Sequence, residues 1–268
     1  MAEARIVVDG RGLVESPRWH AGRLWFADWT AGQILMLDDG GQPHLAAQAP
    51  APPLSFDFAP DGALLVVASG ASQLMRLSVE GALEPVADFG AAGGWNEIVV
   101  DGRGNTYVNG PKLLLIRPDG SVEAQAEGFE FPNGMAVSAD NATLVCAESW
   151  ARRLTAFDVA EDGRLSNRRV WAELEGPPDG LCFDASDAIW YADVGTMRCR
   201  RVREGGEVLD EVLLDRGGFA CMLGGPARRT LYIAAAKWFG MDRMGEMGGT
   251  GQILACEVET PGAGWPYA

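Results

Sequence analysis

The feature that most constrains the fold of this chain is an internal repeat. A short apolar strand, a turn rich in Gly and Asp, and a second apolar strand recur six times along the 268 residues. The equivalent positions in the second strands lie 38 to 45 residues apart, at Leu24, Leu64, Thr106, Leu144, Ile189 and Leu231. A strand-built period of this length is typical of propeller blades with four strands each. We therefore predict an all-β fold, a six-bladed β-propeller, formed as a single domain over residues 1–268.

A β-sandwich is the main alternative, since it also has short strands and frequent turns. A sandwich does not repeat one composite module six times, so the period favours the propeller. We expect the ring to be closed by the N-terminal strand around residues 4–9, which would complete the last blade beside residues 252–257. Such pairing leaves no open sheet edge in the ring.

Composition limits the partners that this chain can have. The formal net charge is −15, and no Lys/Arg-rich stretch is long enough to build a nucleic-acid-binding face. The five cysteines show no C-x-x-C spacing, so neither a disulfide framework nor a zinc knuckle is indicated. The N-terminus has no apolar signal core, and no run of eighteen apolar residues occurs. We expect a cytoplasmic protein that binds neither nucleic acid nor membrane, and the oligomeric state stays open.

In a propeller the first strand of each blade lines the central channel, so equivalent residues of different blades converge at its mouth. In chain order these residues are Glu15, Ser55, Asn96, Asn133, Asp179 and Cys221. Two buried carboxylates would repel each other, and a dication would cancel both charges. Amide oxygens can complete an oxygen shell of the kind that calcium or magnesium prefers.

We therefore predict a divalent-metal site that contains Glu15, Asn96, Asn133 and Asp179. Taken singly, each of these residues is also explained as an ordinary turn or cap residue, and only their shared position in the repeat favours a metal. The usual ligands of zinc are missing from these positions, because His20 and His44 are the only histidines and are expected in a turn and a loop.

The segments around these positions resemble the senescence marker protein/gluconolactonase/luciferin-regenerating enzyme family of six-bladed propellers. The resemblance runs nearly end to end, and its best segments are residues 15–19, 24–28, 95–102, 131–135, 178–182 and 221–226. It implies one calcium-type ion held by Glu15, Asn133 and Asp179, with Mg, Mn or Zn as other candidates. Asn96 is implied as a further ligand or a substrate contact.

The resemblance also implies hydrolysis of a small lactone, with the metal polarising the carbonyl and Asp179 activating water. Sugar-lactone members often carry an Arg shortly before the Asn of the third blade, whereas this chain has Gly93 and Gly94 there. We therefore expect a more apolar lactone or ester. The side chains expected around the pocket are Trp95, Asn96, Phe131, Met135 and Trp150, with Trp238 as a further aromatic that is equally explained by packing.

Several alternatives remain open at this level. Relatives with this fold hydrolyse aryl esters or phosphotriesters, so the substrate is not fixed by the fold. A non-catalytic propeller that binds other proteins would not need acids and amides at the channel mouth. A propeller that condenses amines with aldehydes would not need a metal. A serine hydrolase is disfavoured, since no G-x-S-x-G motif occurs. Cys221 as a nucleophile lacks a His to activate it and is interpreted as a small buried residue.

Overall fold

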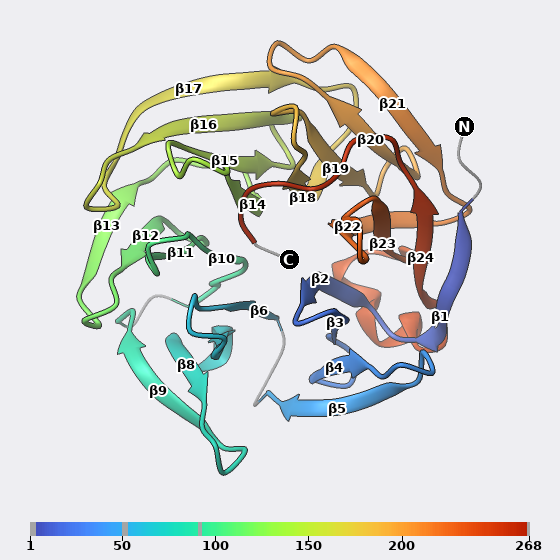
Figure 1. Cartoon of the computed structure of the whole chain (residues 1–268), viewed down its shortest axis with the longest axis horizontal. Helices are drawn as coiled ribbons and strands as arrows, with labels where there is room; N and C mark the ends of the chain where they lie inside the picture. The colour runs from blue at the N-terminus through green and yellow to red at the C-terminus, as the bar shows by residue number, and fades with distance from the viewer. Residues whose placement is uncertain (1–3, 50–52, 91–92, 267–268) are drawn as a thin grey trace.

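The computed structural model describes residues 4–49, 53–90 and 93–266, and these form a ring of six four-stranded antiparallel sheets (Figure 1). This confirms the predicted all-β propeller. Each of the six second-strand positions of the repeat falls inside the second strand of a blade. In the described part of the chain, helical structure is limited to two short 3-10 segments, η1 (Ser69–Ala71) and η2 (Met241–Met247).

In five blades the strands follow the chain from the channel outward, and in the sixth the N-terminal strand β1 takes the outermost place. Blades 1 and 2 consist of β2 (Val14–His20), β3 (Arg23–Asp28), β4 (Gln33–Leu37), β5 (Pro43–Gln48), β6 (Leu54–Phe58), β7 (Leu64–Ala68), β8 (Gln73–Leu77) and β9 (Leu83–Asp88). Blades 3 and 4 consist of β10 (Ile98–Val100), β11 (Thr106–Val108), β12 (Leu113–Ile116), β13 (Val122–Ala126), β14 (Pro132–Val137), β15 (Thr143–Glu148), β16 (Arg153–Val159) and β17 (Leu165–Glu173). Blades 5 and 6 consist of β18 (Pro178–Phe183), β19 (Ile189–Asp193), β20 (Arg198–Val202), β21 (Val208–Leu213), β22 (Gly217–Gly224), β23 (Thr230–Ala236), β24 (Gly251–Glu257) and β1 (Arg5–Arg11).

The N-terminal strand closes the ring as expected. β1 pairs antiparallel with β24, with Arg5 opposite Ala255 and Arg11 opposite Gly251. The last blade is thus built from both ends of the chain, and β1 covers the edge that β24 would otherwise leave unpaired.

Asp-Gly turns join the strands where the sequence indicated hairpins, at residues 61–62, 119–120 and 162–163. The three glycines have φ between 83° and 85°, which is a conformation that favours glycine. The aspartate of each pair accepts a hydrogen bond from the backbone N–H two residues later, at 2.9 to 3.1 Å. These local bonds fix the turns and, with them, the register of the strands.

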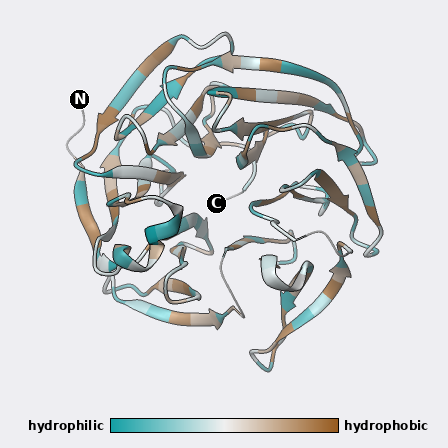
Figure 2. Cartoon of the chain, turned by 180° about the vertical axis from the view of Figure 1, so that it is seen from behind, coloured by the Kyte–Doolittle hydropathy of each residue, from teal (hydrophilic) through white to brown (hydrophobic). Residues whose placement is uncertain are grey.

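The core lies between the blades, because each sheet packs its faces against the neighbouring sheets. The innermost strand β18 is buried at every residue, whereas the outermost strand β17 alternates between exposed and half-buried residues over most of its length. Figure 2 shows hydrophilic and hydrophobic residues mixed along the outer strands. No helix in the described residues is both long and apolar enough to cross a membrane.

The C-terminal segment, residues 258–266, forms a strap that runs across the inner ends of three blades. Gly262 N donates to Arg228 O at 2.7 Å in blade 6, and Ala263 N donates to Phe183 O at 3.2 Å in blade 5. Trp265 and Val137 of blade 4 exchange two backbone hydrogen bonds of 2.7 and 2.9 Å. Figure 1 shows this segment, in red, running along the inner ends of β18 and β14 toward the centre of the ring. These contacts lie at the opposite ends of the inner strands from Asn133 and Asp179.

Candidate metal centre in the channel

Three of the four predicted metal ligands lie next to β-bulges in the innermost strands. Between Pro132 and Met135, β14 advances by three residues while its partner β15 advances by two. The extra residue makes a bulge in the segment that contains Asn133. The same irregularity brackets Asp179 in β18 and directly follows Glu15 in β2. A bulge bends its strand and re-aims the local side chains, which is how neighbouring blades can present polar groups to one channel.

Ser55 differs from these three residues, because its strand β6 pairs with β7 without a bulge. Its hydroxyl is fully buried and hydrogen-bonds within the protein, to Ser16 Oγ at 3.1 Å and to Glu97 Oε1. Blade 2 therefore contributes a supporting hydroxyl to the channel network.

The glycines that follow Asn133 and Asp179 permit close approach of the inner strands. A Cβ added at Gly134 would lie 2.6 Å from Asp179 O, and one added at Gly180 would lie 2.4 Å from the Cβ of Ala220. Neither glycine has a positive φ. The Pro-Asn-Gly and Pro-Asp-Gly sequences are therefore strand residues rather than the β-turns that such tripeptides usually form, and glycine is needed there because the blades touch.

The two carboxamides meet directly. Asn96, which lies just before β10, donates from Nδ2 to Asn133 Oδ1 at 3.0 Å and to Pro132 O at 3.1 Å. Asn109 supports both residues, because its Nδ2 donates to Asn133 O at 2.6 Å and its backbone O accepts from Asn96 N at 2.8 Å. The structure thus brings together the amides that the sequence placed on different blades.

Three carboxylates share the buried channel mouth: Glu15, Asp179 and Glu97, which are 5%, 8% and 7% exposed. Burial, followed by the charges of Asp179 and Glu97, raises the pKa of Glu15 well above its ordinary range. Burial, followed by the charges of Glu97 and Asp193, likewise raises the pKa of Asp179. Each ionised carboxylate therefore disfavours the others, and a bound cation would relieve this repulsion.

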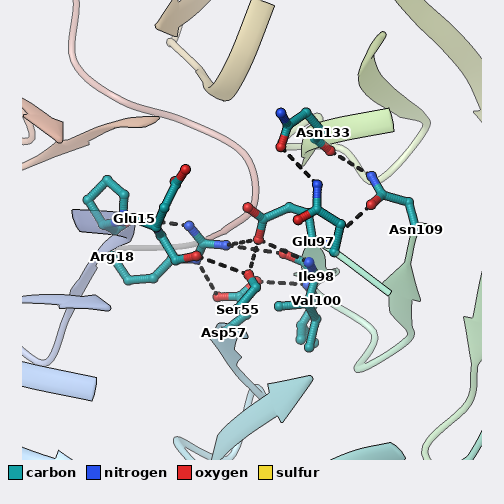
Figure 3. Close-up of polar contacts among 12 residues, drawn as sticks. Glu15, Arg18, Ser55, Asp57, Glu97, Ile98, Val100, Asn109 and Asn133 are labelled. Carbon is teal, nitrogen blue, oxygen red and sulfur yellow. Dashed lines mark hydrogen bonds and ion pairs between the residues drawn. The ribbon is translucent and has the colours of Figure 1, made fainter. Parts of the chain in front are cut away.

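A buried charge network that the sequence analysis did not predict lies beside these groups (Figure 3). Arg18 Nη2 donates to Glu97 Oε1 at 3.2 Å, and its Nε lies 3.4 Å from Asp57 Oδ1. Glu97 Oε1 also accepts from Ile98 N at 3.0 Å and from Ser55 Oγ. Burial raises the pKa of Asp57 to about 6, although the Arg18 charge acts in the opposite direction. The sequence carried one signal of this network: Arg18, Asp57 and Glu97 are charged residues inside or beside apolar inner strands. Charged side chains buried there need partners of opposite charge.

The donor set fits a hard divalent cation only if the amide oxygens take part. Among residues 4–49, 53–90 and 93–266, no group of three or more His, Cys, Asp or Glu side chains is arranged to hold a metal by itself. Glu15 and Asp179 supply two carboxylates, and Asn133 and Asn96 supply neutral oxygens after rotation of the amide group that now donates between them.

The last blade is out of phase with the sequence repeat by two residues. Leu144 pairs with Val137, four residues after Asn133, and Ile189 pairs with Phe183, four residues after Asp179. Leu231 pairs with Leu223, which places Phe219 rather than Cys221 at the equivalent position. Cys221 lies deeper, where its thiol donates to Trp190 O at 3.3 Å inside an apolar cluster between blades 5 and 6. This agrees with its interpretation as a small buried residue.

The aromatic and apolar residues predicted around the pocket separate into two groups. Trp95 and Met135 are 0% and 2% exposed and pack in core clusters between blades, so they have almost no surface to offer a ligand. Phe131 stacks on Trp150 with ring centroids 4.8 Å apart, and Trp150 is 74% exposed. Trp238 is 40% exposed and contacts Phe219 edge-on at 5.6 Å.

Comparison with known proteins finds similar sequences and similar solved structures. The chain is 26% identical to a 6-deoxy-6-sulfogluconolactonase from Pseudomonas putida over 95% of this chain and 94% of that protein. It is 25% identical to a diisopropyl-fluorophosphatase from Loligo vulgaris over 51% of this chain and 53% of that protein. A calcium-binding protein, regucalcin, from Agrobacterium tumefaciens has the same fold, with a TM-score of 0.83, 17% identity and coverage of 99% and 97% of the two chains.

The family is shown by a match to a sequence profile. The sequence profile described as the SMP-30/Gluconolactonase/LRE-like region matches residues 13–237, which include the first strands of all six blades and the four predicted ligands. On this match, the chain belongs to the SMP-30/gluconolactonase/LRE-like family.

Proposed function

We propose that this protein is a divalent-metal-dependent hydrolase that opens a small lactone. The observation that carries the proposal is the convergence of Glu15, Asn133 and Asp179, beside strand bulges, on one buried and strongly acidic channel mouth. The full-length similarity to a sulfogluconolactonase supports the reaction class. The calcium-binding protein of the same fold supports calcium as the ion.

In this proposal Glu15, Asn133 and Asp179 hold the ion, and Asn96 is a further ligand or a substrate contact. A bound divalent cation would supply Lewis-acid polarisation of the lactone carbonyl. Asp179 orients a water molecule and accepts its proton as the water attacks the carbonyl carbon. The acyl–oxygen bond breaks, the ring oxygen takes up a proton, and the product is a hydroxy acid.

Glu97 and Arg18 act as positioning residues in this scheme. Arg18, Ser55 and the Ile98 N–H all donate to Oε1 of Glu97, which fixes the carboxylate beside the two acidic ligands. Its negative charge adds to the attraction for a dication. Because Arg18 Nε also lies 3.4 Å from Asp57 Oδ1, the guanidinium is held from two sides while it orients Glu97.

The test is proton release from a panel of lactones by purified protein, before and after chelator treatment, with calcium, magnesium, manganese or zinc added back. We expect hydrolysis that the chelator abolishes and one cation restores, and an Asp179→Asn variant that folds but shows almost no turnover. Absence of hydrolysis with every lactone by metal-loaded protein, or full activity of Asp179→Asn, would rule the proposal out.

A phosphotriester substrate is the second candidate, and the similarity to the diisopropyl-fluorophosphatase favours including it. The same acidic channel could bind an ion that polarises a phosphoryl oxygen as well as a carbonyl. Adding a fluorophosphate and an aryl ester to the panel separates these chemistries by their relative kcat/KM values.

A further inference from the structure

Trp150 is the feature of the channel rim that the proposed reaction does not explain. Its side chain is 74% exposed, although its indole ring is the largest apolar group that a residue can carry. One face is stacked on Phe131, with ring planes 18° apart and centroids 4.8 Å apart. The opposite face of the indole therefore remains in water, where it is free to stack on a planar or apolar group of a ligand.

The stacked pair is joined to the candidate metal centre through Ser149. Ser149 Oγ accepts from Asn133 Nδ2 at 3.3 Å and donates to Pro178 O at 2.6 Å, next to Asp179. The backbone N–H of the same residue donates to Phe131 O at 3.0 Å. Trp150 thus follows directly after a residue that contacts the strands of two predicted ligands.

A buried ion network holds the segment beneath Trp150 in one conformation. Glu148 is fully buried and accepts hydrogen bonds from Arg153, Arg168, Thr155 and the backbone N–H of Glu130. Phe131, the next residue, has φ of 60°, which is strained for a residue with a Cβ. Strain of this kind is kept where surrounding bonds enforce it, and it recurs at functional sites.

We propose that the exposed face of Trp150 binds a planar or apolar substituent of the substrate, while the lactone ring lies in the channel. The substrate class is then a lactone that carries an uncharged aromatic or alkyl group. The acidic channel and the net charge of −15 disfavour an anionic substituent. This inference rests on the proposed lactonase function for the reaction, and on Trp150 and Phe131 for the specificity.

The experiment compares two lactones of equal ring size, δ-valerolactone and 5-phenyl-δ-valerolactone, in calcium-loaded protein. Because loss of one aromatic stacking contact weakens binding by about tenfold, Trp150→Ala should raise the KM of the phenyl lactone about tenfold more than that of δ-valerolactone. Trp150→Phe should keep most of the selectivity. Val170→Ala, which trims a 49% exposed side chain on β17 of the same blade, should leave both KM values unchanged.

Binding of 2-phenyltetrahydropyran, a cyclic ether without a carbonyl, is measured by calorimetry in parallel. We expect wild-type protein to bind it and Trp150→Ala to bind it about tenfold more weakly. Equal binding by the two proteins, or equal KM changes for both lactones, overturns the assignment of Trp150. If wild-type protein hydrolyses neither these two lactones nor any other lactone of the panel, the lactonase proposal fails, and the ether binding still decides the role of Trp150.

Discussion

Arg18 Nη2 lies 3.2 Å from Glu97 Oε1 across the channel, which joins the innermost strand of blade 1 to the start of blade 3. Their side chains are 8% and 10% exposed, and Asp57 of blade 2 completes the network at 3.4 Å. Three blades are therefore held together by one guanidinium group.

The first prediction concerns this guanidinium. Arg18→Met should lower the free energy of unfolding by about 3–5 kcal/mol, because it leaves two buried carboxylates without their cation. Urea denaturation in chelator measures the change. Arg76→Met is the matched control, since Arg76 bridges Asp61 with both side chains about half exposed and should cost less than about 1 kcal/mol. Equal losses in both variants would contradict a special role for Arg18.

Neutralising a predicted ligand should change stability and metal affinity in opposite directions. Asp179→Asn removes a buried charge repelled by Glu97, so the metal-free protein should gain about 1–2 kcal/mol of unfolding free energy. Calcium affinity should fall on the order of 100-fold, because the ion loses one charged ligand.

Thermal unfolding in chelator and a calcium titration by calorimetry measure the two effects of Asp179→Asn. The control Asp119→Asn changes an exposed turn carboxylate and should alter stability by less than about 0.5 kcal/mol and calcium affinity not at all. If Asp179→Asn lost stability without calcium, the carboxylate would be a structural group instead.

The pH dependence of stability should contain a component from Glu148. Burial alone would raise the pKa of Glu148, but hydrogen bonds from Arg153, Thr155 and the Glu130 N–H outweigh it and lower the pKa from 4.5 to about 2. The ionised form is thus favoured by folding. Its contribution is complete above pH 4.5 and is lost as the pH falls from 4.5 toward 2, on the order of 3 kcal/mol.

Urea denaturation at a series of pH values checks this prediction. Glu148→Gln should be less stable than the wild type at pH 7, and the difference should shrink between pH 4.5 and pH 2. A constant difference over this range would mean that the Glu148 charge does not stabilise the rim of blade 4.

Close approach of the inner strands gives a fourth prediction. Gly134→Ala places a Cβ 2.6 Å from Asp179 O, so β14 and β18 must move apart. We expect a loss of about 1–3 kcal/mol in unfolding free energy and weaker calcium binding, because both strands carry predicted ligands. Gly245→Ala is the control, since a Cβ there meets no atom within 4 Å. Unchanged calcium binding in Gly134→Ala would mean that the spacing of β14 and β18 does not control the metal affinity.

The sequence was sufficient to predict the ring, because hydrophobic runs and Asp-Gly turns repeat locally and set the blades. Glu15, Asn133 and Asp179 could be placed at the channel mouth for the same reason, through their shared position in the repeat, and their role as metal ligands stays a prediction. The bulges that aim them could not be predicted, since a bulge depends on pairing with a second strand. The phase of blade 6 was missed by two residues because its first hairpin is longer: seven residues separate the paired Leu223 and Leu231, against five between Phe183 and Ile189 in blade 5.

Contacts between side chains of different blades also could not be predicted from local sequence patterns. Arg18, Asp57 and Glu97 come from three blades, and only the closed ring shows that they pair. Trp95 could be recognised as an aromatic near Asn96, but its burial against residues such as Phe89 depends on how blades 2 and 3 pack.

The C-terminal strap should make blades 4, 5 and 6 more resistant to local unfolding than blades 1 and 2. It hydrogen-bonds blades 4, 5 and 6 to one continuous segment, while blades 1 and 2 are joined to their neighbours by side-chain packing and the Arg18 network. Amide hydrogens in β14, β18 and β22 should therefore exchange with solvent more slowly than those in β2 and β6. Asn133 and Asp179 would then lie in the blades that exchange slowly and Glu15 in a blade that exchanges faster, so local opening would move one predicted ligand away from the other two.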